Sequence, residues 1–311
     1  MENKNPIEYS IEITKQCPLS CWYCADHGGH FKNSIENIII EKHKDFITYC
    51  ENIKQPLNVS FISGESLLVI DKILEIFPLE KYSYIQFELR TSLSFKDSLK
   101  KLIELKKLLN AKNISLNIQM SLHYEYKNEY KKIIDNPVIE KLFSNSNINY
   151  NFLLFDKKSF LDFKYYKEKY PKKDIIFNIV MPFENPYVFF DNDFIEKNLE
   201  IKWLQDLSKD EIDFLVNENN IWEKTQENII EYKQYFHRTI KDTICSLNKN
   251  YLDISFDGLV LKCANDLYMS PKTELNIKDL EAKDLLEIAK SDNICKWDYC
   301  NLFCRFQENN I

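Results

Sequence analysis

The sequence predicts an α/β fold, because strand-like and helix-like segments alternate along its first 181 residues. Short apolar runs with period-two alternation are followed by longer segments that have apolar residues at helical spacing. Units of this length are typical of parallel strands joined by crossover helices, in an open or closed α/β barrel. With 311 residues and 44% hydrophobic content, the chain can also bury one large core or two smaller ones.

The elements follow one another in a regular order. Six strands are expected, at residues 7–14, 57–62, 84–90, 114–122, 149–155 and 175–181. Five helical segments alternate with them, at residues 34–53, 66–77, 96–109, 126–143 and 160–170. The alternation stops at Pro182, and residues 219–244 form a long amphipathic pattern.

The end of the chain has a different pattern. Strand-like residues 251–256 and 259–263 flank Asp257-Gly258, a pair that favours the tight turn of a hairpin, and a short helix is expected at 280–289. We therefore expect three regions: a core barrel at 1–181, a bridging segment with a long helix at 182–244, and a small Cys-rich module of hairpin and helix at 245–311.

Three cysteines on one loop carry the strongest functional pattern. Cys17, Cys21 and Cys24 form a C-x3-C-x2-C motif directly after the first strand. With nine cysteines in the chain, this spacing is expected by chance about 0.01 times or less. Three thiolates can hold a four-iron cluster and leave one iron open. Zinc is the alternative, but structural zinc sites usually close with four ligands. Cys50 lies in a helical pattern and fits a buried position better than a fourth ligand.

The triplet, with Tyr23 before its third cysteine, resembles the cluster loop of the radical S-adenosylmethionine (radical SAM) superfamily. The resemblance implies a partial (β/α)6 TIM-like barrel with this loop after its first strand. It also implies a [4Fe-4S] cluster whose open iron binds S-adenosylmethionine. Reductive cleavage of that cofactor yields methionine and a 5′-deoxyadenosyl radical, which abstracts a substrate hydrogen. An electron donor such as flavodoxin or ferredoxin is implied as a partner.

Further cofactor contacts are expected where later strands end, since ligands of parallel α/β folds bind over the carboxyl ends of the strands. Ser63-Gly64-Glu65-Ser66 is similar to the family's Gly-Gly-Glu-Pro motif, which holds the amino group of S-adenosylmethionine; Ser63 and Ser66 replace the first Gly and the Pro. The same segment also suits an ordinary helix start.

The ends of the third and fourth strands add further polar candidates. Arg90-Thr91-Ser92 and Ser121 fall where the family places ribose and carboxylate contacts. His123 is a candidate proton donor or substrate contact, or an ordinary loop histidine. No other residue is assigned a catalytic role.

A second group of cysteines lies near the end of the chain. Cys245 and Gly258-x4-Cys263, followed by Cys295, Cys300 and Cys304, resemble the auxiliary-cluster domains called SPASM and twitch. The full SPASM pattern has seven cysteines, whereas five are present here, which favours one auxiliary [4Fe-4S] cluster. Which four of the five are its ligands stays open, and zinc is again the alternative.

Composition narrows the class of protein. The net charge of −7 argues against a broad nucleic-acid-binding surface. No signal peptide and no run of about 18 apolar residues is present, and nine cysteines are an odd number for a disulfide framework. We therefore expect a cytoplasmic protein without a membrane span.

The function expected from these observations is that of a radical SAM oxidoreductase or maturase acting on a peptide or a small metabolite. The alternative is a non-catalytic zinc or iron–sulfur protein that serves as a binding module. The substrate, the bond formed, the oligomeric state and whether S-adenosylmethionine is consumed or regenerated stay open.

Overall fold

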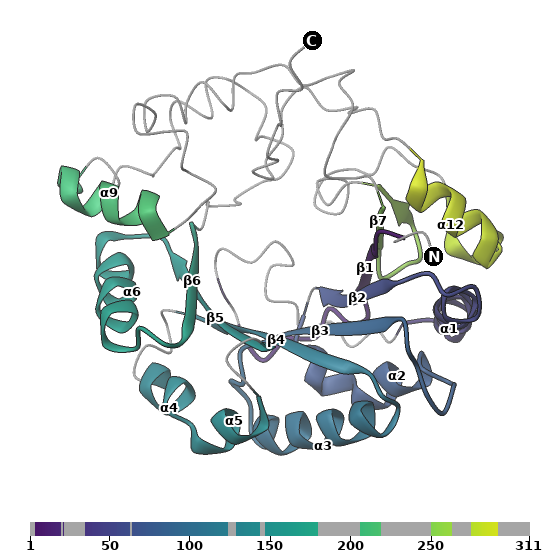
Figure 1. The fold of residues 1–311 in the computed structure, drawn as a ribbon, viewed down its shortest axis with the longest axis horizontal. Coiled ribbons are helices and arrows are strands. Elements are labelled where there is room, and N and C mark those ends of the chain that lie inside the picture. Colours follow the sequence, from purple (N-terminus) through teal and green to yellow (C-terminus); the bar gives the residue numbers. More distant parts are fainter. Residues whose placement is uncertain are drawn as a thin grey trace, which may run out of the picture. The chain divides into compact units, whose positions relative to one another are not determined.

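The computed structural model of the chain describes residues 4–19, 21, 35–62, 64–123, 129–143, 147–179, 206–218, 250–262 and 275–291. The described strands are β1 Ile7–Glu12, β2 Leu57–Ile62, β3 Ile85–Thr91, β4 Ser115–Leu122, β5 Ile148–Leu154, β6 Asp174–Ile179, β7 Tyr251–Ile254 and β8 Val260–Leu261. The helices are α1 Asn37–Asn52, η1 Ser66–Val69, α2 Ile70–Glu75, α3 Ser98–Ala111, α4 Tyr130–Ile134, α5 Pro137–Leu142, α6 Lys157–Lys169, α9 Lys209–Glu218, η6 Ile277–Asp279 and α12 Ala282–Lys290, where η marks a 3₁₀ helix (Figure 1).

The predicted α/β fold class, a partial (β/α)6 barrel, is confirmed. The described strands are hydrogen-bonded in the order β6-β5-β4-β3-β2-β1-β7-β8. The pairs β1–β2, β2–β3 and β5–β6 are parallel, as strands joined by crossover helices must be. The predicted hairpin is also present, as the antiparallel pair β7–β8. The auxiliary-cluster domain is not visible among the described residues.

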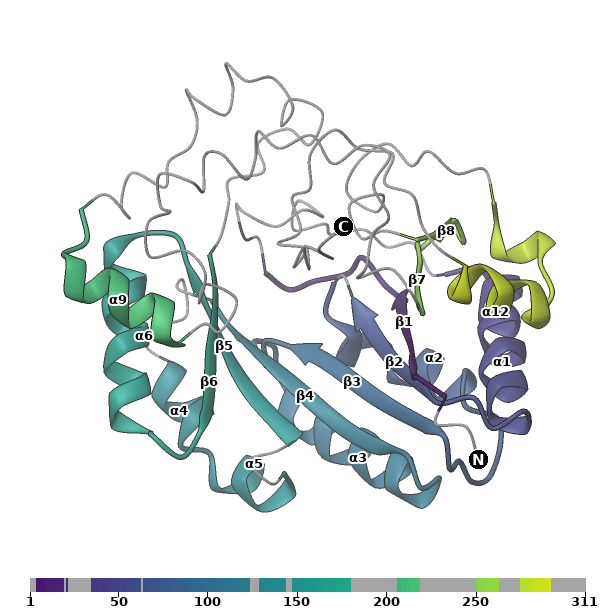
Figure 2. The same cartoon turned by 45° about the horizontal axis from the view of Figure 1, so that its top comes forward.

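The chain divides into two compact units, Met1–Gln119 with Cys245–Asn293 and Met120–Ile244 with Ile294–Ile311. In the first unit, β7 pairs in parallel with β1, opposite to the side taken by β2 (Figures 1 and 2). The helix α12 packs against α1 and β7. The hairpin of the late sequence is therefore a continuation of the sheet that contains β1.

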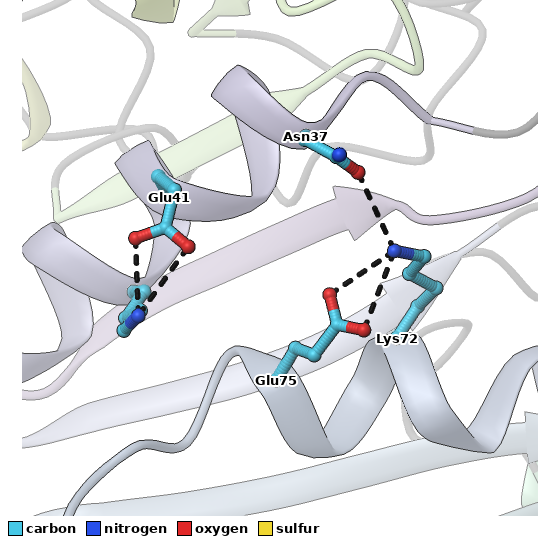
Figure 3. Close-up of polar contacts among 5 residues, drawn as sticks. Asn37, Glu41, Lys72 and Glu75 are labelled. Carbon is cyan, nitrogen blue, oxygen red and sulfur yellow. Dashed lines mark hydrogen bonds and ion pairs between the residues drawn. The ribbon is translucent and has the colours of Figure 1, made fainter.

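One side of this sheet is covered by α1 and α2, whose facing side chains form the core of the first unit. Tyr9 on β1 packs against Phe46 on α1, with ring centroids 4.8 Å apart, and both side chains are fully buried. At the surface, Lys72 on α2 pairs with Glu75 and reaches Asn37 at the start of α1 (Figure 3). Exposed ion pairs of this kind contribute little to stability, so apolar packing holds these helices on the sheet.

The second unit has an aromatic core between α6 and the strands β5 and β6. Phe163 on α6 packs edge-to-face against Phe152 and Phe177, and Phe214 of α9 joins this cluster. The sequence does not predict α9, because no strand-like run precedes it. The predicted helix at 126–143 is two short helices, since Pro137 begins α5 and the Asn136 side chain caps it.

A buried polar pair lies between β1 and α1, and it should make stability depend on pH. Tyr9 Oη and His43 Nδ1 lie 2.6 Å apart, both residues are fully buried, and His43 Nε2 has no partner among the described residues. Burial lowers the pKa of His43 to about 3. In the unfolded chain the pKa of this histidine is about 6.5. The stability that depends on its being neutral is therefore fully present above pH 6.5, and it is lost as the pH falls from there towards 3.

We therefore expect the free energy of unfolding to fall by up to about 1.4 kcal/mol per pH unit between pH 6 and 4 through this residue. The double variant Tyr9→Phe/His43→Leu, which removes both polar partners, should show a shallower slope in urea denaturation over this range. The single variant Tyr9→Phe keeps the histidine and should keep the slope. Equal slopes for the wild type and the double variant would refute this account.

Candidate active site

The end of β1 leads into the cysteine loop through residues that are held close to the sheet. Gln16 N donates to Thr14 Oγ1 at 3.0 Å, which tightens the turn just before Cys17. Cys17 is half-buried, and Cys21 is only 7% exposed. Leu19 between them is also buried, at 3%. Cys21 is therefore sheltered from solvent, and Cys17 partly so, on a loop that leaves the carboxyl end of β1.

The loop after β2 packs backbone to backbone against this turn. Gly64 has a φ of +56°, and a Cβ at this position would lie 2.5 Å from Thr14 O and 2.7 Å from Gln16 O. Glu65 N donates to Gln16 O at 2.7 Å. Only glycine combines this backbone conformation with so close an approach. Gly64 and Glu65 are thereby joined to the residues that lead into Cys17.

The side chain of Glu65 is 2% exposed and joins the loops after β2 and β3. Its Oε1 accepts a hydrogen bond from Thr91 Oγ1 at 2.7 Å, and its Oε2 accepts from Ser92 N and Ser92 Oγ, both at 3.0 Å. Burial raises the pKa of this carboxyl, and the hydrogen bonds from Thr91 and Ser92 oppose that rise. Glu65 is thus a buried acid whose oxygens are occupied by protein donors.

A second buried acid connects β1 with the hairpin. Glu12 at the end of β1 is 2% exposed, and its Oε2 accepts from Phe256 N at 2.9 Å. Phe256 is the second residue after β7, which runs parallel to β1, so this contact lies at the same strand ends as the cysteine loop. Sequence reasoning missed this role. The available signal was an acid between two apolar residues, Ile11 and Ile13, at the end of the strand.

Ser121 and His123 lie at the end of β4, in the second unit. Both are partly buried. Burial lowers the pKa of His123 to about 4, so its imidazole is neutral at pH 7. Their predicted roles toward the cofactor or substrate stay predictions.

Several predicted site residues lie outside the described part of the chain. They are Tyr23, Cys24, Ser63, Cys245, Cys263, Cys295, Cys300 and Cys304. Within the described part, no group of three or more His, Cys, Asp or Glu side chains is arranged to hold a metal ion. Nor does any helix there combine the length and apolarity needed to span a membrane.

The described residues fit an iron–sulfur cofactor in their chemistry. Thiolates are the usual ligands of such clusters, and Cys17 and Cys21 lie on the loop that leaves the carboxyl end of β1, the end of the strands at which ligands of parallel α/β folds bind. Because Gly64 has no side chain, the backbone after β2 can approach the backbone of Thr14 and Gln16, just before Cys17, closely. Limited access of solvent also suits a redox centre, because the surroundings of a metal site control its redox potential.

Comparison with the solved structure of anSMEcpe supports this fold. The protein anSMEcpe with bound AdoMet (S-adenosylmethionine) has a TM-score of 0.53 and 17% identity, over 91% of this chain and 80% of that one. BtrN in complex with AdoMet and 2-DOIA has a TM-score of 0.42 and 12% identity, over 91% and 82%. Streptococcus suis SuiB bound to precursor peptide SuiA has a TM-score of 0.44 and 14% identity, over 92% and 65%.

No protein-family model matches the sequence, and no curated protein matches it. The likeness to anSMEcpe, at 17% identity, concerns the fold. It agrees with the resemblance that the cysteine triplet carries. The chain therefore has the fold of the radical SAM enzymes.

Proposed function

We propose that this chain is a radical SAM enzyme that cleaves S-adenosylmethionine reductively and abstracts a hydrogen atom from a substrate. The observation that carries the proposal is the packing of Gly64 and Glu65 against Thr14 and Gln16, directly before Cys17. This packing supports the proposal, because it joins Gly64 and Glu65 to the turn before Cys17, at the strand ends where ligands of parallel sheets bind.

Cys17, Cys21 and Cys24 would hold a [4Fe-4S] cluster. When bound, the cluster supplies the electron that cleaves S-adenosylmethionine. Because the Glu65 carboxylate is occupied by Thr91 and Ser92, we assign the contact with the amino group of the cofactor to backbone oxygens of residues 63–65. Leu19 and Cys21, both buried, exclude water from one side of this loop.

We also propose one auxiliary cluster, with four ligands among Cys245, Cys263, Cys295, Cys300 and Cys304. The hairpin supports it, because β7 and β8 are antiparallel and therefore bring Asn250 and Lys262 to the same end of the pair. In the sequence, Cys245 precedes Asn250 by five residues and Cys263 directly follows Lys262. Gly258, with a φ of +88°, provides the turn. A peptide and a small metabolite both stay open as substrates.

Anaerobic purification and reconstitution test this function. We expect about eight irons per chain for two four-iron clusters, and release of 5′-deoxyadenosine from S-adenosylmethionine only when a reductant such as dithionite is present. Iron and sulfide are counted chemically, and the nucleoside is measured by liquid chromatography with mass spectrometry. A chain that binds zinc and releases no 5′-deoxyadenosine would instead be the binding module that is the alternative.

A further inference from the structure

A chain of hydroxyl groups extends from Glu65 into the loop between β3 and α3. Ser92 Oγ donates to Glu65 Oε2 at 3.0 Å, and Ser94 Oγ lies 2.6 Å from Ser92 Oγ. Ser94 is half-buried, and among the described residues it has no second partner. The chain therefore begins at a buried acid and ends at a hydroxyl group near the surface of the loop.

The acid sets the direction of every proton in this chain. An ionised carboxylate can only accept hydrogen bonds, so the single proton of Ser92 Oγ is directed to Glu65. Ser92 Oγ can then only accept from Ser94, whose own proton is directed inward. Ser94 Oγ consequently presents lone pairs, and no proton, to anything that binds beside it.

The loop that carries Ser94 is held in a conformation that needs support. Leu93 has a φ of +50° and Asp97 a φ of +65°, values that side chains other than glycine rarely adopt. Leu93 N donates to Thr91 Oγ1 at 3.1 Å, and Ser98 Oγ donates to Leu93 O at 3.0 Å. Backbone strain of this kind persists where surrounding contacts hold it, and it is concentrated at binding sites.

Building on the proposed function, we propose that Ser94 Oγ accepts a hydrogen bond from a donor group of S-adenosylmethionine, and that Glu65 and Ser92 are positioning residues that orient it. The loop follows β3, next to the end of β2, where ligands of such sheets bind. The donor is a ribose hydroxyl or the ammonium group, since both present protons that a serine with inward-directed hydrogen can accept.

Binding measurements on the reconstituted protein test the proposal without relying on turnover. In anaerobic calorimetry with S-adenosylmethionine, Ser94→Ala should raise the Kd about three- to tenfold, the value of one hydrogen bond. Ser92→Ala, which leaves the Ser94 hydroxyl present but unoriented, should raise it about two- to threefold. Ser94→Thr retains the hydroxyl and should bind like the wild type. Ser115→Ala is the control for the substitution itself, because Ser115 is exposed and begins β4, at the end of the strands that lies away from the candidate site.

Two fragments identify the donor. 5′-Deoxyadenosine carries the ribose hydroxyls without the ammonium group, and L-methionine carries the ammonium group without the ribose. Ser94→Ala should weaken the binding of one fragment only, and that fragment contains the donor.

Equal weakening of both fragments would mean a general disturbance and would overturn the inference. So would an unchanged Kd in Ser94→Ala, or a larger loss in Ser92→Ala than in Ser94→Ala. If the wild-type protein with its iron in place neither binds nor cleaves S-adenosylmethionine, the proposed function itself fails. Thermal unfolding of each variant shows whether it folds. If Ser94→Ala does not fold, the comparison is made with Ser94→Thr, which retains the hydroxyl group.

Discussion

Replacing Cys17, Cys21 or Cys24 with alanine is expected to remove about four irons per chain and to lower 5′-deoxyadenosine release below detection. Each substitution deletes one of three thiolate ligands, and alanine offers no donor atom in its place. Iron counting and the reductant-dependent release assay, both after anaerobic reconstitution, measure the two effects.

Other cysteines of the same chain are matched controls. Cys50 is fully buried on α1, and burial raises the pKa of its thiol to about 12, so it is a protonated core side chain. Cys50→Ala should keep all of the iron. Cys245→Ala and Cys263→Ala should lose about half of the iron and still permit cleavage. Retention of cleavage in Cys17→Ala would contradict the proposed function.

The second large effect is expected from Gly64→Ala. Its added methyl group would meet two backbone oxygens, of Thr14 and Gln16, at 2.5 and 2.7 Å, and neither can rotate away. The left-handed backbone costs alanine about 1–2 kcal/mol in addition. We expect the turn before Cys17 to shift and 5′-deoxyadenosine release to fall by about 100-fold, since small misplacements at a reacting centre have effects of this size.

Gly258→Ala separates this loss from general destabilisation. Gly258 also has a positive φ, +88°, but its added methyl group would meet side-chain atoms of Asn276, Ile277 and Ile39. Both variants should lower the melting temperature, whereas only Gly64→Ala should lose most of its cleavage rate. Wild-type cleavage by Gly64→Ala would show that the approach of the two loops is not needed for activity.

The regular part of the fold could be predicted from local patterns. Strand and helix periodicity is a property of neighbouring residues, so the six strands of the predicted barrel lie within a few residues of their expected positions. The pairing of β7 with β1 could not be predicted in this way. Nothing in residues 251–254 specifies which of several strands is their partner, because that depends on packing between segments about 240 residues apart.

The candidate site shows the same division. The cysteine spacing and the Gly64-Glu65 pair are local patterns, and they identified the loops after β1 and β2. Sequence reasoning singled out Thr91 and Ser92 as polar strand ends but not as partners of Glu65, since that contact depends on the register of β2 and β3. The left-handed backbone conformation of Leu93 could not be predicted, because a leucine in the sequence gives no sign of it.

The parallel pairing of β7 with β1 has a consequence for how the protein is made. During synthesis from the amino terminus, β1 emerges before the other described strands, and its partner at residues 251–254 emerges only after about 240 further residues have been translated. Until then one edge of the strand that leads to Cys17 has unpaired N–H and C=O groups, which invite association with other chains. Contacts of such long range also form slowly. The assembly of the cysteine loop's supporting strand is thus one of the last events in folding.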